Sequence, residues 1–172
     1  MGGMTDAPSP LDIDFVAHPE LMDQVTLDVM PCFAIYSAAN AVTRFYRKAL
    51  AETGLTYPQY LVMMVLWETK GLTMKALGER LGLDSNTLTP LVKKLEARGR
   101  VTRARSKADE RLLDIAPTDA GMSLRRTGCE AAIAMTANSG ETFESQAELR
   151  ARIMRVRDGL DNFAADAPAD AT

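Results

Sequence analysis

Apolar residues recur every three or four positions along most of the chain, a pattern typical of amphipathic helices. The helices that this pattern predicts cover residues 29–53, 57–70, 74–81, 85–98, 118–137 and 145–163. Asp28 is expected to cap the first helix, with Pro31 in its first turn, and Gly54 and Gly71 are expected to end the first two helices. The chain is therefore predicted to be mainly α-helical.

The helix over residues 74–81 and the helix that follows it are separated by a short break containing glycine. Thr73 and Asp84 precede these two helices and are expected to cap them. A short helix, a tight turn and a second amphipathic helix form a helix-turn-helix pattern, although the same pattern fits an ordinary helical hairpin. Pro90 lies beyond the first turn, so the second helix either bends there or becomes regular late.

The periodicity changes after Gly99 to one that predicts strands. Residues 101–105 form a predicted strand, residues 106–110 a polar turn, and residues 111–115 the returning strand, which Pro117 ends. A hairpin directly after a helix-turn-helix indicates a wing. The predicted fold is therefore mainly α with a small β-hairpin, and its winged helix-turn-helix covers about residues 56–117.

The 172 residues are expected to form one domain over residues 25–163. Residues 1–24 are rich in Asp, Pro, Gly and Ala, so we expect a mobile N-terminal extension, and we expect residues 164–172 to form a loose tail. No apolar run reaches the length of a membrane span, and the N-terminus lacks the pattern of a signal peptide. We therefore expect a cytoplasmic protein without a membrane partner.

The chain contains two cysteines and one histidine. This number is small for a structural zinc site, and no other cofactor pattern is present, so we expect neither a metal nor a cofactor. Two cysteines among ten methionines also do not resemble a secreted disulfide scaffold. In a reducing cytoplasm, such a pair is more often catalytic or redox-sensing.

Positive charge is concentrated in the predicted winged helix. The whole chain has a net charge of −3, whereas residues 70–111 contain eleven Lys or Arg residues against five acids. That segment therefore has a charge of +6, and the rest of the chain has −9. A basic module on an acidic body is expected of a protein that binds DNA phosphates.

The candidate chemistry lies within residues 29–62, which hold Cys32 and all four tyrosines of the chain. Cys32 is expected in the first turn of its helix, where free N–H groups and the helix dipole favour a thiolate. Tyr36 lies one turn later on the same face. Tyr46 lies roughly 21 Å along the same helix, so it cannot contact Cys32 of its own chain unless the helix breaks, but it could contact Cys32 of a second chain whose helix crosses antiparallel. Alternatively, the tyrosines pack a core with their hydroxyls at its edge.

Specific motifs in this region resemble those of the organic hydroperoxide resistance regulators of the MarR superfamily. The resemblance extends from about Leu27 to Gly121. Its motifs are Pro31-Cys32-Phe33-Ala34-Ile35-Tyr36-Ser37-Ala38, Arg44-Phe45-Tyr46, Gly54-Leu55-Thr56-Tyr57-Pro58-Gln59-Tyr60-Leu61 and the wing motif Asp109-Glu110-Arg111. The resemblance implies a MarR-type homodimer with an all-helical dimerisation region, here about residues 28–53 and 118–163.

The resemblance also implies the roles of the two cysteines. Cys32 matches the peroxide-sensing thiol, and Tyr36, Tyr46 and Tyr57 match the tyrosines around it, some of which come from the partner subunit. One branch of the family carries a second cysteine in the region of Cys129, where it forms a disulfide with the sensing cysteine of the other subunit, so the resemblance implies that Cys129 is the resolving thiol, although the sequence around it is less diagnostic than that around Cys32. The alternative for Cys129 is a small buried hydrophobic residue, as most free cysteines are.

By the same resemblance, the chain is expected to be a repressor rather than an enzyme, bound to a near-palindromic double-stranded operator and released when organic hydroperoxides oxidise Cys32. The expected major-groove contacts are Ser85, Asn86, Thr87, Thr89 and Lys93, and the contacts to phosphates and the minor groove are Arg103, Arg105, Lys107 and Arg111.

Two other functions are compatible with the sequence. One is a MarR-type repressor that a small phenolic or drug-like ligand releases from DNA, with Cys32 incidental. The other is a thiol peroxidase, which would turn over with a reductant, although a winged helix is not expected in such an enzyme.

Overall fold

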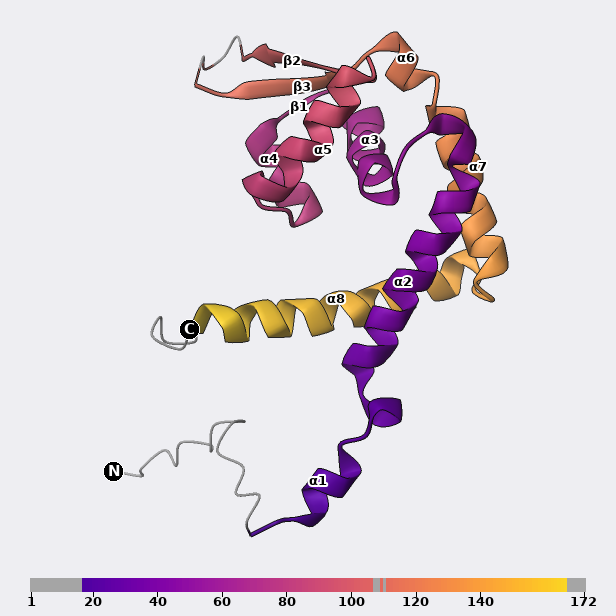
Figure 1. Cartoon of the computed structure of the whole chain (residues 1–172), viewed down its shortest axis with the longest axis vertical. Helices are drawn as coiled ribbons and strands as arrows, with labels where there is room; N and C mark the ends of the chain where they lie inside the picture. The colour runs from indigo at the N-terminus through magenta and orange to yellow at the C-terminus, as the bar shows by residue number, and fades with distance from the viewer. Residues whose placement is uncertain (1–16, 107–108, 110, 167–172) are drawn as a thin grey trace. The chain divides into compact units, whose positions relative to one another are not determined.

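A computed structural model describes residues 17–106, 109 and 111–166 of the chain (Figure 1). The chain divides into two compact units at residues 42 and 43. The first unit contains α1 (Glu20–Gln24), a 3₁₀ turn at Leu27–Val29 and the first part of α2 (Pro31–Ala49). The second unit contains the end of α2 and all later elements.

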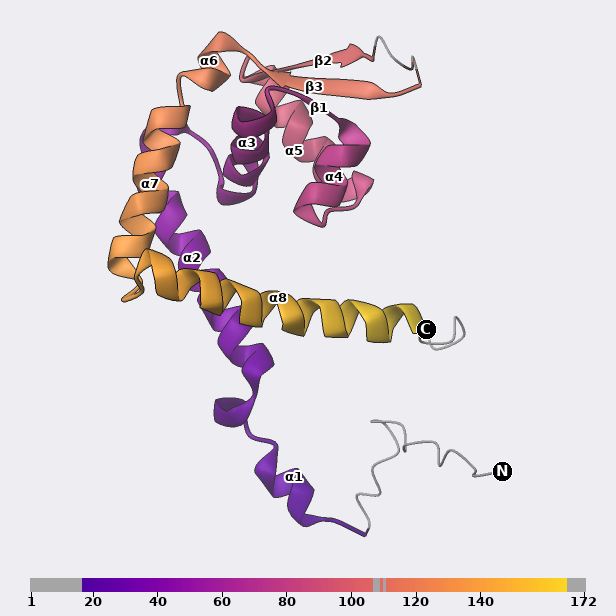
Figure 2. The same ribbon diagram turned by 180° about the vertical axis from the view of Figure 1, so that it is seen from behind.

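The second unit is a winged helix followed by further helices. Its elements after α2 are α3 (Tyr57–Thr69), β1 (Leu72–Thr73), α4 (Met74–Leu81), α5 (Ser85–Ala97), β2 (Val101–Arg105), β3 (Leu113–Pro117), α6 (Asp119–Met122), α7 (Arg125–Asn138) and α8 (Phe143–Asp166). The three strands form an antiparallel sheet in the order β1-β3-β2. Helices α3, α4 and α5 lie on one side of this sheet, as the opposite views in Figures 1 and 2 show.

The core of the winged helix lies between α3, α4, α5 and the sheet. Its completely buried side chains include Val62, Leu66, Leu77, Val92, Leu95 and Ile115. Trp67 at the end of α3 is also buried, and its Nε1 donates to the carbonyl oxygen of Gly121 in α6 at 3.0 Å. This bond joins the winged helix to the helical segment that follows it.

The predicted caps of the helix-turn-helix are confirmed. Thr73 Oγ1 accepts a hydrogen bond from the main-chain nitrogen of Ala76 at 3.1 Å, and Asp84 Oδ1 accepts one from that of Thr87 at 2.8 Å. Pro90 lies inside α5, which is helical from Ser85 onward, so the proposed late start of this helix is wrong. Pro90 lacks the main-chain N–H that would bond within the helix. The buried side chains of Leu88, Val92 and Leu95 on the apolar face of α5 offset this loss.

The predicted start of the first helix is wrong by two residues. α2 begins at Pro31, and Asp28 lies in the preceding 3₁₀ turn instead of capping the helix. The cause is Pro31, which disfavours helical backbone angles at the residue before it. Met30 accordingly has extended angles (φ −79°, ψ 114°). α2 ends at Ala49, and a second 3₁₀ turn leads to Gly54, whose φ of 69° makes the expected left-handed stop.

The first strand of the wing, β2, covers the predicted residues 101–105, whereas the second strand is displaced by two residues. β3 covers Leu113–Pro117 rather than residues 111–115, so Arg111 precedes the strand and Pro117 belongs to it. Pro117 lies opposite Val101 at the end of the pairing, where a missing N–H interrupts no interior bond. The two-residue strand β1 was not predicted, since so short a segment has no recognisable alternation.

Three further helix limits differ from the prediction. α3 ends at Thr69, and Lys70 rather than Gly71 adopts the left-handed conformation that stops it (φ 61°). The helix predicted over residues 118–137 is divided into α6 and α7. α8 begins at Phe143, ahead of the predicted residue 145, and Thr142 Oγ1 accepts from the main-chain nitrogen of Ser145 at 3.1 Å in its first turn.

Candidate functional site

Cys32 lies in the first turn of α2, where its thiol is free and exposed. Tyr36 follows one turn later and is 65% exposed. The apolar side chains of Val29, Phe33 and Ile35 in the same segment are also exposed. The sensing thiol predicted from the sequence therefore lies on an apolar surface, and Tyr36 is the tyrosine that its own unit provides.

The other three tyrosines form a stack in the second unit. The ring of Tyr46, at the end of α2, lies 4.7 Å from that of Tyr57 and 5.0 Å from that of Tyr60, measured between centroids. Tyr46 and Tyr60 are almost completely buried, and Tyr57 is half-buried. Within a single chain, Tyr46 and Tyr60 are therefore packed in a core, as the alternative interpretation of the sequence expected, whereas Tyr36 is open to solvent.

Burial makes the hydroxyl groups of the stack harder to ionise. It raises the pKa of Tyr46, Tyr57 and Tyr60 above the usual value. The pKa of Tyr60 is raised further by its neighbour Tyr46 and by the nearby thiol of Cys129. Like any tyrosine, these three residues carry no charge at neutral pH and can donate hydrogen bonds, and the raised pKa moves their ionisation further from that range.

Cys129 lies in α7 and is exposed rather than buried in the single chain. The residue before it, Gly128, contacts α3 directly. A Cβ atom at Gly128 would lie 2.6 Å from Cζ3 of Trp67 and 3.1 Å from Cε2 of Tyr60. The hydroxyl of Tyr60 donates to the carbonyl oxygen of Gly128 at 2.9 Å.

The structure therefore brings Cys129, Gly128 and the tyrosine stack together. The sequence analysis gave no role to Tyr60 or Gly128. The spacing of three between Tyr57 and Tyr60 on one helix was the available signal for a shared face. Gly128, which contacts that face, lies 68 residues after Tyr60, and no local sequence pattern connects the two.

The predicted DNA-reading residues lie at the start and along the open face of α5. Ser85, Asn86, Thr87 and Lys93 are exposed, and Thr89 is half-buried. Thr87 also donates from its hydroxyl to Asp84 Oδ2 at 3.1 Å, in addition to its main-chain bond. Hydrogen bonds from Thr87 hold the pKa of the Asp84 carboxyl below its usual value. The beginning of the reading helix is therefore fixed by an ionised cap.

The predicted wing residues differ in their surroundings. Arg105 and Arg111 are exposed, whereas Arg103 is half-buried and donates from Nε to Glu96 Oε2 at 2.6 Å. This ion pair ties β2 to the end of α5. Lys107 lies outside the described residues. The main-chain nitrogen of Arg111 donates to Oδ1 of Asp109 at 2.9 Å, which fixes the turn before β3.

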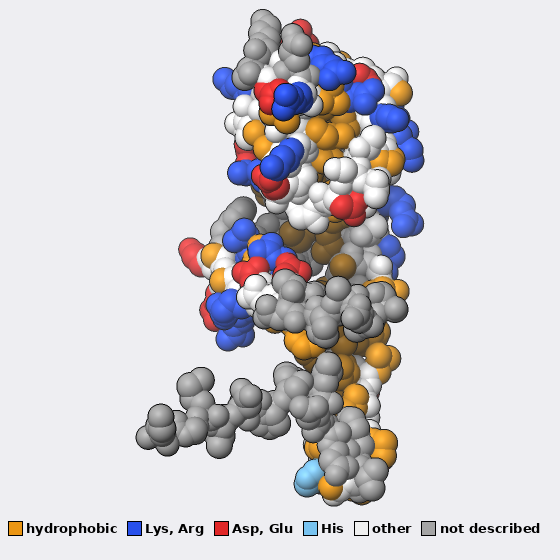
Figure 3. Space-filling view, turned by 90° about the vertical axis from the view of Figure 1, so that its left-hand side faces the viewer, with side chains coloured by type: hydrophobic (Ala, Val, Ile, Leu, Met, Phe, Trp, Pro, Cys, Tyr) orange, Lys and Arg blue, Asp and Glu red, His pale blue; other side chains and the backbone are white. Residues whose placement is uncertain are grey.

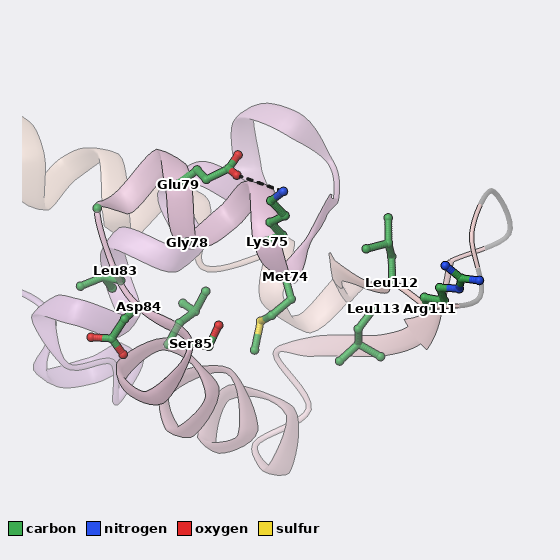
Figure 4. A pocket seen from close by; sticks show the side chains of 12 residues that line it. Met74, Lys75, Gly78, Glu79, Leu83, Asp84, Ser85, Arg111, Leu112 and Leu113 are labelled. Carbon is green, nitrogen blue, oxygen red and sulfur yellow. Dashed lines mark ion pairs between the residues drawn. The ribbon is translucent and has the colours of Figure 1, made fainter.

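A hollow of about 550 Å³ lies between the start of α5, which holds the predicted DNA-reading residues, and the wing. The start of α4, the turn before α5 and the start of β3 line it, and Ser85 and Arg111 are both among its lining residues (Figure 4). Lys75, which the sequence analysis did not select, also lines the hollow and forms an ion pair with Glu79. Lys and Arg side chains are spread over the part of the molecule that contains the sheet (Figure 3).

The described part of the chain contains neither a candidate metal site nor a candidate membrane-spanning helix. No group of three His, Cys, Asp or Glu residues there is arranged to hold a metal ion. Among the helices described, none is long and apolar enough to cross a membrane.

Comparison with known proteins identifies a family of regulators. Residues 44–126 match a family model described as transcriptional regulator SarA/Rot. The HTH-type transcriptional regulator TtmR of Methylorubrum extorquens is 56% identical over 103 residues, which are 60% of this chain and 53% of TtmR. The chain thus spans about half the length of that relative.

The similarity to a Bacillus subtilis protein is more extensive. The organic hydroperoxide resistance transcriptional regulator of that organism is 35% identical over 138 residues, which are 80% of this chain and 94% of that protein.

Solved structures of AbfR from Staphylococcus epidermidis share the fold. Reduced AbfR bound to DNA has a TM-score of 0.69 and 32% identity, over 86% of this chain and 97% of AbfR. Disulfide-formed AbfR has a TM-score of 0.57 and 34% identity, over 81% of this chain and 98% of AbfR. The winged-helix fold expected from the sequence is confirmed, and the chain belongs to the family of organic hydroperoxide resistance transcriptional regulators.

Proposed function

We propose that the chain is a homodimeric DNA-binding repressor that senses organic hydroperoxides through Cys32. The observation that carries this proposal is the free, exposed thiol of Cys32 in the first turn of α2, in a member of this family. Main-chain N–H groups of a first helical turn stabilise an anion, and the thiolate is the form of cysteine that attacks peroxides. The proposed role is that of a regulator rather than an enzyme.

The proposed oxidation has two steps. The Cys32 thiolate attacks the terminal peroxide oxygen, an S–O bond forms, the O–O bond breaks, and the alkoxide leaves as the alcohol by taking up the proton that the thiol lost on ionisation. The thiolate of Cys129 from the partner subunit then attacks the sulfur of this sulfenic acid. An S–S bond forms, the S–O bond breaks, and the oxygen leaves as water. Tyr36, Tyr46 and Tyr57 are proposed to donate hydrogen bonds to the sensing sulfur, some of them across the dimer.

The DNA-reading part of the proposal rests on the winged helix and its charge. Ser85, Asn86, Thr87, Thr89 and Lys93 are proposed to contact the major groove of a near-palindromic operator. Arg105, Lys107 and Arg111 are proposed to contact phosphates and the minor groove. Arg103, also selected from the sequence, is proposed to contribute less because Glu96 neutralises it. AbfR is known as a reduced and as an overoxidised form bound to DNA and also as a disulfide form, which supports a DNA-binding protein with an oxidisable thiol and makes the disulfide, rather than oxidation as such, the state proposed to release DNA.

The test compares wild type, Cys32→Ser and Cys129→Ser after treatment with an organic hydroperoxide. Wild type should yield a covalent dimer on a non-reducing gel and release DNA. Cys129→Ser should stop at the sulfenic acid or be overoxidised to the sulfinic acid. Cys32→Ser should do neither and remain bound to DNA.

Two results would contradict parts of the proposal. Release of Cys32→Ser from DNA by hydroperoxide would refute Cys32 as the sensor and favour a repressor controlled by a phenolic or drug-like ligand. A wild type that is oxidised without cross-linking would retain Cys32 as the sensor and reduce Cys129 to a packing residue. A DNA-binding assay with and without hydroperoxide detects the first result, and mass spectrometry without reductant detects the second.

A further inference from the structure

α3 and α7 are joined at the peptide bond that precedes Cys129. The hydroxyl of Tyr60, which is 1% exposed, donates at 2.9 Å to the carbonyl oxygen of Gly128. That carbonyl and the main-chain nitrogen of Cys129 belong to the same planar peptide group. The hydrogen bond therefore acts on the backbone that carries the proposed resolving thiol.

The donor in this bond has little freedom to move. The Tyr60 ring is stacked on Tyr46, with 5.0 Å between centroids, and lies edge-on to Trp67 at 6.1 Å. Trp67 is itself tied to Gly121 through its indole nitrogen. Gly128 has no side chain to hold α7 away from these rings. The hydroxyl is thus presented by a packed aromatic cluster rather than by a mobile surface side chain.

We propose that Tyr60 is a positioning residue for Cys129, because its hydroxyl fixes the Gly128–Cys129 peptide and thereby sets the rate at which Cys129 condenses with oxidised Cys32. This inference rests on the proposed function, since it assigns a determinant of the second oxidation step. Tyr60 is not placed in contact with either sulfur of the reacting pair and acts through the main chain.

The condensation depends on position because it competes with a second oxidation. Cys129 must approach the sulfenic sulfur in line with the S–O bond that breaks, and holding two reacting groups in such a geometry raises their effective concentration. If the approach is delayed, another hydroperoxide molecule converts the sulfenic acid to a sulfinic acid. The ratio of disulfide to sulfinic acid therefore reports how well Cys129 is positioned.

The same stack connects both proposed steps. Tyr46 and Tyr57, which the proposed function places beside the sensing sulfur, stack with each other, and Tyr46 stacks on Tyr60. One aromatic cluster thus contains hydroxyls assigned to the first step and the hydroxyl that anchors Cys129 for the second.

Tyr60→Phe tests the proposal because it keeps the ring and removes only the hydroxyl. Sulfenic acid at Cys32 is followed by trapping with a dimedone-type reagent, and the disulfide is followed on quenched non-reducing gels. The rate of sulfenic acid formation should stay within about twofold of wild type. Disulfide formation should be about three- to tenfold slower, because the Gly128 carbonyl loses the hydrogen bond from Tyr60, and sulfinic acid should accumulate.

Thr53→Val is the matched control. Thr53 is also buried, and in the 3₁₀ turn after α2 its hydroxyl donates to the carbonyl oxygen of Leu50 at 2.7 Å and accepts from the main-chain nitrogen of Leu55 at 3.1 Å. This variant should lose at least as much stability as Tyr60→Phe without changing the ratio of disulfide to sulfinic acid. In a Cys129→Ser background, Tyr60→Phe should leave the product distribution unchanged.

Three results would overturn the proposal. An unchanged disulfide rate in Tyr60→Phe, with normal cross-linking of wild type, would remove the role of Tyr60 and leave the proposed function intact. An equal change in Thr53→Val would show a general loss of stability instead of positioning. A wild type that never cross-links would refute the resolving role of Cys129 and, with it, the role of Tyr60.

Discussion

Gly128 determines how close α7 can lie to α3. A Cβ atom at this position would be 2.6 Å from Cζ3 of Trp67, a distance that requires the helix or the indole ring to move. We therefore expect Gly128→Ala to lower the free energy of unfolding by about 1–3 kcal/mol, the usual cost of overpacking a core. Urea denaturation followed by circular dichroism measures this change.

Gly159 in α8 provides the matched control, since an added Cβ there meets nothing within 4 Å in the described chain. Alanine is favoured over glycine inside a helix, so Gly159→Ala should raise the free energy of unfolding by about 0.5–1 kcal/mol. Equal effects of the two substitutions would contradict the close packing assigned to Gly128.

The residues of the candidate site were predictable from the sequence where a local rule applies. Cys32 was expected near a helix start because Asp28 was predicted to cap the helix and Pro31 to lie in its first turn; the cap is wrong, but the structure places Cys32 in the first turn of α2. The bond between Tyr60 and Gly128 was not predictable, because it joins residues far apart in the sequence through the packing of two helices. Whether Tyr46 and Tyr57 reach the sensing sulfur of a partner stays a prediction.

The helices and strands of the winged helix were predicted well because capping residues and glycines mark their limits. The limits of two other helices were predicted wrongly. Met30 is forced out of the helical region by Pro31, which shortens α2, and the helix after the wing is interrupted between α6 and α7. The ion pair between Arg103 and Glu96 was also not foreseen, since charge counting treats every arginine as available to DNA.

Arg103 and Arg111 should therefore respond differently to the same substitution. Arg111 lies in an exposed turn at the edge of the hollow beside α5, so Arg111→Gln should weaken operator binding by about 1–3 kcal/mol without changing thiol oxidation. Arg103→Gln should mainly lower stability, by up to about 1 kcal/mol, because it breaks the pair with Glu96. Fluorescence anisotropy with a duplex selected from random DNA, together with urea denaturation, separates these effects.

The two arginines serve as controls for each other. If Arg103→Gln weakened binding as much as Arg111→Gln while stability was unchanged, the structural role of Arg103 would be wrong. If hydroperoxide reactivity fell together with affinity in Arg111→Gln, the separation of DNA reading from thiol sensing would be wrong.

Several large apolar side chains in the described part of the chain are exposed to solvent. On α8, five large apolar side chains are between 42% and 63% exposed: Leu149, Ile153, Val156, Leu160 and Phe163. They recur at spacings of three and four, so they form one stripe along the helix. A stripe of this length is expected to be covered by a second copy of the chain, consistent with the proposed homodimer.

Leu160→Glu tests this expectation by placing a charge in the stripe, where Leu160 is 63% exposed in the single chain. At micromolar concentration, wild type should sediment as a dimer, and the variant should shift toward monomer because burying an unpaired carboxylate is unfavourable. Asn162→Glu is the control, since it adds the same charge two residues away on the same helix, outside the stripe. Analytical ultracentrifugation compares the three proteins.

DNA binding should change together with assembly. Each wild-type dimer brings two winged helices of charge +6 to the two halves of a near-palindromic site, so affinity should fall by about a thousandfold or more between 50 and 200 mM salt. Leu160→Glu should bind a single half-site with a shallower salt dependence, because fewer phosphates are neutralised, whereas Asn162→Glu should behave as wild type. A monomeric wild type, or binding that is insensitive to salt, would contradict both the dimer and the electrostatic role of its two basic modules.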